Sequence, residues 1–181
     1  QKNNYLPRLS SGELIGSFGL TESEAGSDPK SIKTYFKENK EGYIINGSKN
    51  WITNATIADI FIIWAKDEKG LIKGFIVEKK DKGLSTKLID NKLSLLLSPT
   101  GQIYLDNVFV PKNRVLPLTE GLKSVFLCLN KARYGIAWGV MGASEFIWHT
   151  AKEYVETRKV FNKPLAANQL IQKKLTDMQT E

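Results

Sequence analysis

The feature that most constrains the fold is a series of short apolar runs between residues 13 and 117. Turn-forming residues separate the runs, as at Asn46-Gly47 and Asp81-Lys-Gly83. Short strands at nearly even spacing, without a long helical pattern between them, indicate an antiparallel barrel or sandwich. The predicted strands are Leu14–Leu20, Ile32–Glu38, Gly42–Gly47, Ile60–Trp64, Gly74–Val77, Leu84–Ile89, Gln102–Leu105 and Val108–Val110.

The pattern changes after Pro117. From Val125 to Tyr154, apolar residues recur at steps of three or four, which predicts one long helix with an apolar face. A second helix is expected to begin near Pro164. Strands followed by helices predict an α+β fold. Two helices cannot complete a bundle alone, so they are expected to be only its first part. An antiparallel β-barrel domain would be followed by the first helices of a C-terminal helical bundle.

Composition narrows the classes of partner. The 181 residues carry a net charge of +7, but the lysines are spread through turns, and no RNP motif, zinc-finger spacing or basic helix accompanies them. We therefore expect no nucleic-acid partner. The apolar runs are too short to cross a bilayer, so no membrane partner is expected. A single cysteine, Cys128, excludes an internal disulfide and fits a reducing compartment.

The first chemically informative stretch is Phe18 to Asp28. An apolar segment runs into Thr21-Glu22 and breaks at Ala25-Gly26-Ser27-Asp28, with Pro29 next. Glycine admits close backbone approach, and a Ser-Asp-Pro turn points amides outward, which suits a flavin edge or a phosphate. The alternative is an ordinary strand followed by an Asx-type turn.

The second stretch is Gly47 to Asn54. If it is a strand, Trp51 and Thr53 lie on one side, where an indole could pack on a planar heterocycle and the hydroxyl could bond its edge. The alternative is a core tryptophan beside a strand threonine.

Two helical positions are also candidates. Phe126, Asn130 and Arg133 share one helical face, where the guanidinium could meet a phosphate or a carbonyl, or form a surface ion pair. Arg158 lies near the end of the long helix, where a cation is favourable in any case. With one histidine and one cysteine, we predict no metal site, and we predict no Rossmann nucleotide loop.

Together these stretches resemble the acyl-CoA dehydrogenase family, and within it the glutaryl-CoA-oxidising branch. Gly19-Leu-Thr-Glu-Ser-Glu-Ala-Gly-Ser-Asp-Pro-Lys-Ser31 is similar to that family's flavin signature. Lys49-Asn-Trp-Ile-Thr53, Thr100 and Val108-Phe-Val-Pro111 follow in family order. Segments Cys128–Gly139 and Pro164–Leu175 resemble the glutaryl branch, and the similarity extends over essentially all 181 residues.

The resemblance implies FAD as cofactor and assigns site residues. Ser27 would also touch the acyl-CoA, and Thr53 would hydrogen-bond the N5 region of the flavin. Arg158 and Gln169 would contact the FAD of a neighbouring subunit, which implies a homo-oligomer, with a tetramer as the family norm. The implied cofactor contacts are Phe18, Gly19, Leu20, Thr21, Glu22, Ser23, Glu24, Ala25, Gly26, Ser27, Trp51, Ile52, Thr53, Arg158 and Gln169. The implied substrate contacts are Ser27, Phe126, Leu127, Cys128, Leu129, Asn130, Lys131, Ala132 and Arg133.

The implied activity is oxidation of an acyl-CoA, in the glutaryl branch with decarboxylation to crotonyl-CoA, followed by reoxidation by an electron-transfer flavoprotein. The family's catalytic glutamate would lie downstream of this chain, so no catalytic residue is assigned here. The expected location is the mitochondrial matrix in a eukaryote and the cytoplasm otherwise. We expect residues 1–12 to end a truncated helical domain, 13–117 to form the barrel, and 118–181 to open the C-terminal bundle.

Three positions depart from the family pattern. Ser23 stands where proline is usual, Leu96 where arginine is usual, and Asn130 where straight-chain members have aspartate and the glutaryl branch has asparagine. Two rival functions stay open. One is a dehydrogenase for another acyl-CoA, and the other is a non-catalytic flavin-binding or interaction module.

Overall fold

The computed structural model describes residues 2–181, which form two compact units. The first unit reaches to Phe126, and the second runs from Leu127 to Glu181. The elements of the first unit are α1 (Lys2–Ser10), β1 (Gly16–Gly19), the 3₁₀ turn η1 (Pro29–Ser31), β2 (Tyr35–Glu38), β3 (Gly42–Thr53), β4 (Ile60–Lys66), β5 (Ile72–Glu78), β6 (Leu84–Leu88), β7 (Thr100–Pro111) and the 3₁₀ turn η2 (Lys112–Arg114).

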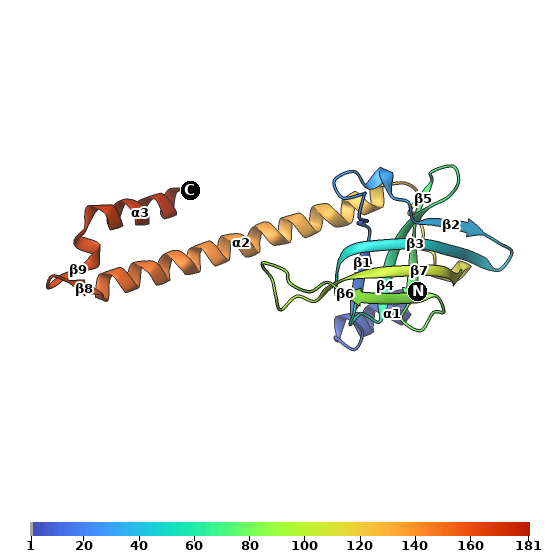
Figure 1. The fold of residues 1–181 in the computed structure, drawn as a ribbon, viewed down its shortest axis with the longest axis horizontal. Helices are drawn as coiled ribbons and strands as arrows, with labels where there is room; N and C mark the ends of the chain where they lie inside the picture. The colour runs from blue at the N-terminus through green and yellow to red at the C-terminus, as the bar shows by residue number, and fades with distance from the viewer. Residues whose placement is uncertain (1) are drawn as a thin grey trace. The chain divides into compact units, whose positions relative to one another are not determined.

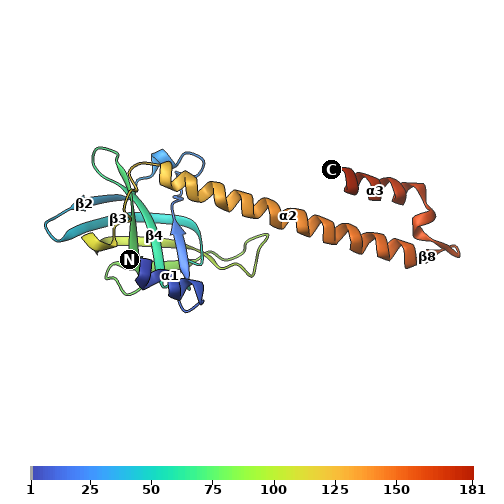
Figure 2. The same ribbon diagram turned by 180° about the vertical axis from the view of Figure 1, so that it is seen from behind.

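The strands of the first unit form one curled sheet, a half-barrel (Figures 1 and 2). Its order is β1-β4-β2-β3-β7-β6, with β5 paired to β4. The predicted α+β class is therefore confirmed. Most strand pairs are antiparallel as expected, but β4 pairs in parallel with β1 and with β2. The first of these pairings places β1 beside β4, which lies some forty residues later in the chain, with Gly16 opposite Ile60.

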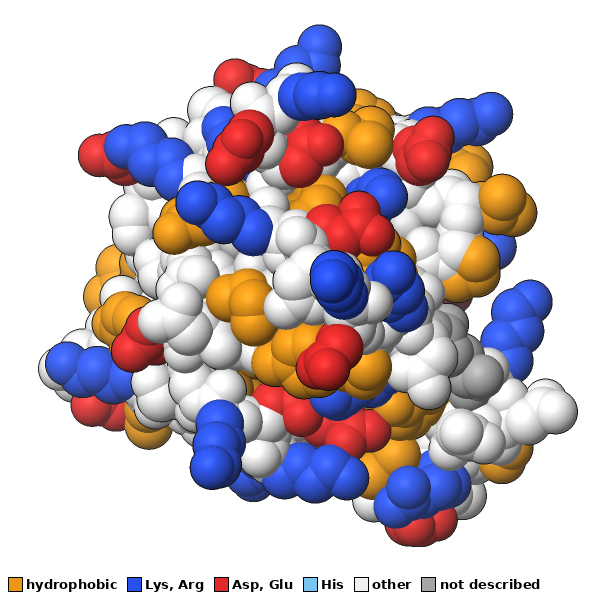
Figure 3. Space-filling view, turned by 90° about the vertical axis from the view of Figure 1, so that its right-hand side faces the viewer, with side chains coloured by type: hydrophobic (Ala, Val, Ile, Leu, Met, Phe, Trp, Pro, Cys, Tyr) orange, Lys and Arg blue, Asp and Glu red, His pale blue; other side chains and the backbone are white. Residues whose placement is uncertain are grey.

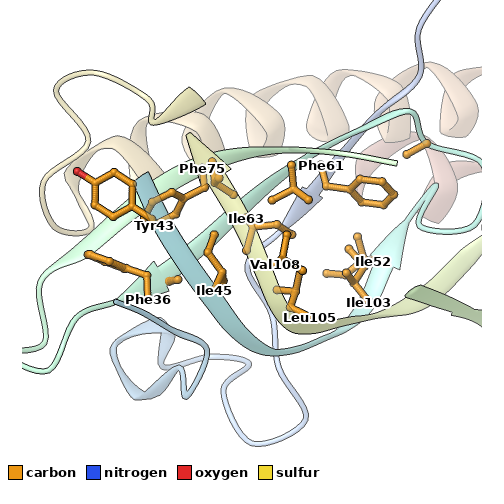
Figure 4. Close-up of a cluster of buried hydrophobic side chains, with 14 of the residues drawn as sticks. Phe36, Tyr43, Ile45, Ile52, Phe61, Ile63, Phe75, Ile103, Leu105 and Val108 are labelled. Carbon is orange, nitrogen blue, oxygen red and sulfur yellow. The ribbon is translucent and has the colours of Figure 1, made fainter. Parts of the chain in front are cut away.

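The core of the sheet is built from one face of β2, β3, β4, β5 and β7 (Figure 4). Phe36, Tyr43 and Phe75 form an aromatic trio with ring centroids 5.0–5.6 Å apart. Such tilted pairs contribute about 0.5–1.5 kcal/mol each beyond the area they bury. The remaining members are Ile45, Ile52, Ala55, Ala58, Phe61, Ile63, Ala65, Val77, Ile103, Leu105, Val108 and Val110.

Two predicted strands prove to be one. Gln102–Leu105 and Val108–Val110 both belong to β7, which continues through Asn107 at φ +52°. This kink is matched by a register shift in β3, where the Asn46 side chain accepts from the Asn107 amide at 2.8 Å. A Cβ at the neighbouring Gly47 would lie only 2.6 Å from Thr34, the residue before β2, so glycine allows the two segments to approach closely there.

The second unit contains most of α2 (Lys123–Thr157), which begins in the first unit, and then β8 (Lys159–Val160), β9 (Lys163–Pro164), the 3₁₀ turn η3 (Leu165–Ala167) and α3 (Gln169–Thr180). The long helix is confirmed. The second helix begins later than Pro164, because residues 165–167 form the 3₁₀ turn and the Asn168 side chain caps α3 by accepting from the Leu170 amide at 3.0 Å.

Charge is dispersed on the face drawn in Figure 3, where Lys and Arg side chains alternate with acidic and apolar ones. That distribution agrees with a solvated lysine-rich surface rather than a basic stripe. Across residues 2–181, no helix combines the length and the apolar character that crossing a membrane requires.

Candidate functional site

The candidate site is organised by a bulge in β3. Its pairing with β7 shifts between Lys49 and Ile52, and Trp51 there adopts φ +60°, in the left-handed region. Strict alternation from Ile45 would place Lys49, Trp51 and Thr53 all on the core side. The bulge reverses the alternation after Lys49, so Ile52 enters the core at 3% exposure and Trp51 faces outward at 58%.

This arrangement decides between the two interpretations of Trp51. The side chain is exposed together with Thr53, so the alternative of a core tryptophan is wrong. A left-handed backbone at a bulky residue costs about 1–3 kcal/mol and persists where the surroundings hold it, a pattern typical of functional sites. The bulge therefore leaves an indole and a hydroxyl exposed two residues apart in β3.

The Phe18–Ser27 segment forms a strand and then a tight turn. Glu22 and Ala25 exchange two backbone hydrogen bonds of 3.2 Å, which leaves Ser23 and Glu24 exposed at the tip. Asp28 then caps the following 3₁₀ turn by accepting from the Lys30 amide at 3.1 Å. The Asx-type turn that the alternative interpretation named is thus present, and it follows directly on the candidate site.

The structure brings the two stretches together through β3. The Asn50 amide donates to the Thr21 carbonyl at 2.8 Å, and the Asn50 side-chain amide donates to the Ser23 hydroxyl at 3.4 Å. The Ser17 hydroxyl donates to the Thr53 carbonyl at 3.0 Å. Residues far apart in the sequence therefore share one wall, as the sequence interpretation required.

A buried ion pair lies beneath that wall. The Lys49 ammonium, whose side chain is 0% exposed, lies 2.8 Å from the Glu22 carboxylate and 3.1 Å from the Leu20 carbonyl. The same carboxylate accepts from the backbone amides of Lys33 at 2.6 Å and Thr34 at 3.0 Å. Both charges are thus hydrogen-bonded, which burial of a charge demands.

Burial and charge act in opposite directions on this pair. Desolvation lowers the pKa of Lys49 to about 8, although the Glu22 carboxylate counteracts the shift. Desolvation alone would raise the pKa of Glu22, but the Lys49 charge and the hydrogen bonds from Lys49, Thr34 and Lys33 outweigh it and hold that pKa below its usual value. The pair is therefore ionised at neutral pH.

The predicted cofactor contacts divide by exposure. Gly19, Leu20, Glu22, Ala25 and Ile52 are buried, so they could meet a ligand through backbone groups alone. Phe18 is half-buried, with its ring 6.0 Å from that of Trp64, and Thr21 is half-buried as well. Side chains are exposed at Ser23, Glu24, Ser27, Trp51 and Thr53, and Gly26 is exposed too.

The exposed groups fit a planar, acceptor-rich ring. An indole supplies a flat apolar face, and the Thr53 hydroxyl beside it supplies a donor. Around Gly26, no atom lies within 4 Å of the position that a Cβ would take, so the backbone there is open to a ligand. An isoalloxazine ring, with nitrogens and carbonyls along its edge, has the complementary chemistry.

In the second unit, the predicted substrate contacts from Leu127 to Arg133 lie on the first turns of α2, and Phe126 precedes them at the end of the first unit. Leu129 is half-buried, while Cys128, Lys131 and Ala132 are exposed. The Arg133 guanidinium donates to the Asn130 side chain at 3.0 Å, one helical turn away. That bond holds a cation and an amide together on one exposed helical face.

Arg158 and Gln169 flank the β8–β9 hairpin. The Arg158 carbonyl accepts from the Leu165 amide at 2.7 Å, and both Arg158 and Gln169 have exposed side chains. The hairpin turn places Phe161 and Asn162 at φ +51° and +61°. Two consecutive left-handed residues are the geometry of a type I′ turn, which fixes how the chain passes from α2 to α3.

Sequence reasoning missed two contributors. Lys49 and Asn50 were part of a family motif, but no role was predicted for either residue. Both matter because of the β3 bulge, which turns Asn50 toward Thr21 and leaves Lys49 on the core side. A charged residue within a strand that otherwise buries apolar side chains is a signal that could have been used. Within residues 2–181, no group of three metal-ligating side chains occurs.

Comparisons with known proteins place both units in one family. Residues 17–108 match the family described as "Acyl-CoA dehydrogenase, middle domain", and residues 119–181 match "Acyl-CoA dehydrogenase, C-terminal domain". A probable acyl-CoA dehydrogenase of Bacillus subtilis is 38% identical over 98% of this chain and 30% of its own length. A glutaryl-CoA dehydrogenase of Desulfococcus multivorans is 36% identical over 99% of this chain and 48% of its own length.

Among solved structures, a glutaryl-CoA dehydrogenase from Mycobacterium smegmatis in complex with FADH2 superimposes with a TM-score of 0.93. It is 44% identical, over 97% of this chain and 45% of that protein. The chain therefore spans half or less of the length of the proteins that it resembles.

Proposed function

Because the chain belongs to the acyl-CoA dehydrogenase family, we propose that its protein oxidises an acyl-CoA thioester between Cα and Cβ, with FAD as its cofactor. The observation that carries the proposal is the exposure of Trp51 and Thr53 on β3, next to Asn50, which is hydrogen-bonded to Thr21 and Ser23 of the adjacent turn. FAD supplies, when bound, the acceptor for the hydride that leaves Cβ. The residues of this chain bind and orient the flavin and the acyl-CoA.

In this proposal, Trp51 covers one face of the flavin ring and the Thr53 hydroxyl donates to the ring's N5 region. Backbone groups of Phe18–Ser27 line the ring edge, and Ser27 also meets the acyl-CoA. Preorganised donors of this kind act on charge that develops during the reaction without having to rearrange. The role assigned here is positioning, and proton abstraction from Cα is not assigned to a residue of this chain.

The helical residues have separate proposed roles. Phe126–Arg133 hold the pantetheine arm of the substrate, with the Asn130–Arg133 pair offering an amide and a cation to carbonyls or phosphates. Arg158 and Gln169 contact the FAD of a neighbouring subunit. That role needs at least a homodimer, and we propose a homotetramer.

For the substrate, we propose glutaryl-CoA, with decarboxylation to crotonyl-CoA after oxidation. The support is Asn130, the residue that the glutaryl branch has at this position, together with the similarity to two glutaryl-CoA dehydrogenases. A relative described as a probable acyl-CoA dehydrogenase is 38% identical, so another acyl-CoA is the competing substrate.

The test compares substrates in the full-length protein. With a dye as electron acceptor, we expect glutaryl-CoA to be oxidised faster than butyryl-CoA, with CO₂ released in step with oxidation. Equal rates would contradict the glutaryl assignment and favour another acyl-CoA. Bound flavin that no acyl-CoA reduces would favour a non-catalytic binding module.

Two further proposals follow from family membership. The physiological acceptor is an electron-transfer flavoprotein, and replacing the dye by this protein should sustain turnover. The location is the mitochondrial matrix in a eukaryote and the cytoplasm otherwise, which cell fractionation with an antibody against the protein would test.

A further inference from the structure

The buried Glu22–Lys49 pair differs from the proposed ligand contacts, because neither of its charges can touch a ligand directly. The Lys49 side chain is 0% exposed and that of Glu22 is 8% exposed. Their polar atoms are occupied by each other, by the Leu20 carbonyl, and by the amides of Lys33 and Thr34. The proposed binding roles therefore leave the pair itself unexplained.

Stability alone does not account for such a pair. Removing two charges from water is costly, and replacing a buried ion pair by apolar side chains of similar size is often neutral or stabilising. A pair with complete hydrogen bonding does, however, define one arrangement of the segments that it joins. The role of the pair therefore depends on which segments it joins.

The bonds of the Lys49 ammonium join the two segments of the candidate flavin wall, which are the Leu20–Ser27 turn and the Asn50–Thr53 part of β3. Lys49 immediately precedes the β3 bulge, and its ammonium reaches Leu20 and Glu22, the entrance to the exposed turn. In the next residue of β3, the Asn50 backbone amide donates to the Thr21 carbonyl. The lysine stem also crosses β1, since a Cβ at Gly19 would lie 3.4 Å from Lys49 Cγ.

We propose that the Glu22–Lys49 pair is a positioning element that holds Trp51 and Thr53 against the Leu20–Ala25 segment and thereby sets how tightly the flavin is bound. This inference rests on the proposed function. Trp51 can face outward only while the bulge keeps its left-handed backbone. When the pair is removed, the bulge loses the contact that fixes its start, and Trp51 is free to return to the extended conformation and the other face of β3.

The test uses the double substitution Glu22→Gln with Lys49→Met in the full-length protein, because it removes both charges and leaves neither one unpaired. We expect FAD to bind at least about tenfold more weakly, a change of about 1.4 kcal/mol. The visible absorption bands of the bound flavin should shift. Hydrogen exchange at the Asn50 amide should accelerate by a similar factor, and this measurement requires no flavin.

The matched control is Asp81→Asn with Arg114→Met, which removes a largely buried ion pair elsewhere in the same unit. Arg114 donates to Asp81 at 2.8 and 3.0 Å, and the two side chains are 15% and 11% exposed. We expect this variant to keep the FAD affinity, the flavin spectrum and the Asn50 exchange rate of the parent. This should hold even if its melting temperature falls as much as that of the Glu22→Gln, Lys49→Met variant.

A milder variant covers the case in which the double substitution prevents folding. Glu22→Asp keeps the charge but shortens its reach, so it should produce a smaller loss of FAD affinity and a smaller rise in Asn50 exchange. Unchanged FAD affinity and unchanged exchange in a folded variant would overturn the positioning role. If the parent protein itself binds no FAD, the proposed function fails, and the Asn50 exchange rate alone then decides whether the pair holds the bulge.

Discussion

At the scale of single residues, Trp51 and Lys49 owe their opposite environments to one irregularity. They are two positions apart in β3, yet one is 58% exposed and the other has a fully buried side chain. The inserted bulge residue separates them onto different faces. An exposed aromatic side chain and a buried charged one therefore lie within three consecutive residues.

Trp51→Gly tests whether the tryptophan is kept for binding rather than for folding. Glycine stabilises the folded protein by relieving the left-handed strain, but it also stabilises the unfolded chain by increasing its conformational freedom. The two effects nearly cancel, so the free energy of unfolding should change by no more than about 1 kcal/mol. FAD affinity, measured by quenching of flavin fluorescence, should nevertheless fall about tenfold or more. Ile52→Ala is the contrasting control, since it empties a core position and should lower stability by about 2–5 kcal/mol. A large stability loss in Trp51→Gly would contradict this account.

Glu22→Gln tests the ion pair through its pH dependence. The pKa of Glu22 in the folded protein lies below its usual value of 4.5, so its contribution to stability is complete above that value and is lost as the pH falls through the folded pKa. At pH 7 the substitution leaves Lys49 unpaired and should destabilise by about 3 kcal/mol. As the pH falls below 4.5 and through the lower folded pKa, the carboxylate of the parent is protonated as well, so the difference between the melting temperatures of parent and variant should shrink.

The control for the pH experiment is Glu13→Gln. Glu13 pairs with Arg8 at 2.6 Å, but both side chains are about half exposed, so the pair should contribute less than about 1 kcal/mol at any pH. A melting difference for Glu22→Gln that stays constant or widens on acidification would show that the carboxylate is not held ionised by Lys49.

Residue-scale prediction succeeded where local chemistry sufficed. A turn after Leu20 followed from the glycine and Ser-Asp-Pro signals, and the common exposure of Trp51 and Thr53 followed from the period-two argument. The partner of Lys49 did not, because the ion pair joins positions 27 residues apart and depends on the bulge, which local propensity does not encode.

At the scale of elements, the Lys92 ammonium makes three hydrogen bonds within and at the end of the loop between β6 and β7. Lys92 donates to the carbonyls of Leu95 and Ser98 and to the Thr100 hydroxyl, at 2.5–3.0 Å. Leu96, which stands where the family generally has arginine, lies in this loop and is 72% exposed. The loop is therefore organised from within by Lys92, and the Leu96 side chain remains largely in solvent.

Lys92→Met should loosen this loop selectively. The Ser98 amide, which donates to the Leu95 carbonyl at 3.0 Å, should exchange with solvent about tenfold faster, since charge-assisted bonds contribute roughly 1.5–3 kcal/mol. Amides of β7 itself should keep their protection. Lys87→Met, in neighbouring β6, removes an exposed lysine and should leave Ser98 unchanged. Equal exchange at Ser98 in both variants would contradict the role of Lys92.

Element boundaries show what sequence patterns resolve. The long helix was predicted because its apolar period continues over many turns. The division of β7 into two strands was wrong, because Asp106-Asn107 looks like a turn, whereas Asn107 is a kink stabilised by Asn46 across the sheet. The parallel pairings of β4 were also not foreseen, since they join segments that are distant in the sequence.

At the scale of the whole molecule, two family domains adjoin in one chain. Family membership came from motifs and was confirmed by both domain matches and by structures with TM-scores above 0.9. Family membership does not determine the substrate, because a glutaryl-CoA dehydrogenase and a butyryl-CoA dehydrogenase are 36% and 35% identical to this chain. Substrate choice depends on side chains around the acyl group, which pattern and fold class do not specify.

The proposed function requires that an acyl-CoA reduce a flavin held against Trp51 and Thr53. Its most direct test is anaerobic addition of glutaryl-CoA to the purified full-length protein while the visible flavin absorption is followed. We predict that the bound flavin bleaches upon addition, and that Trp51→Gly, reconstituted with FAD at saturation, bleaches more slowly. A parent protein that retains no FAD, or whose flavin spectrum stays unreduced with glutaryl-CoA, butyryl-CoA and other acyl-CoA esters, would contradict the proposed function.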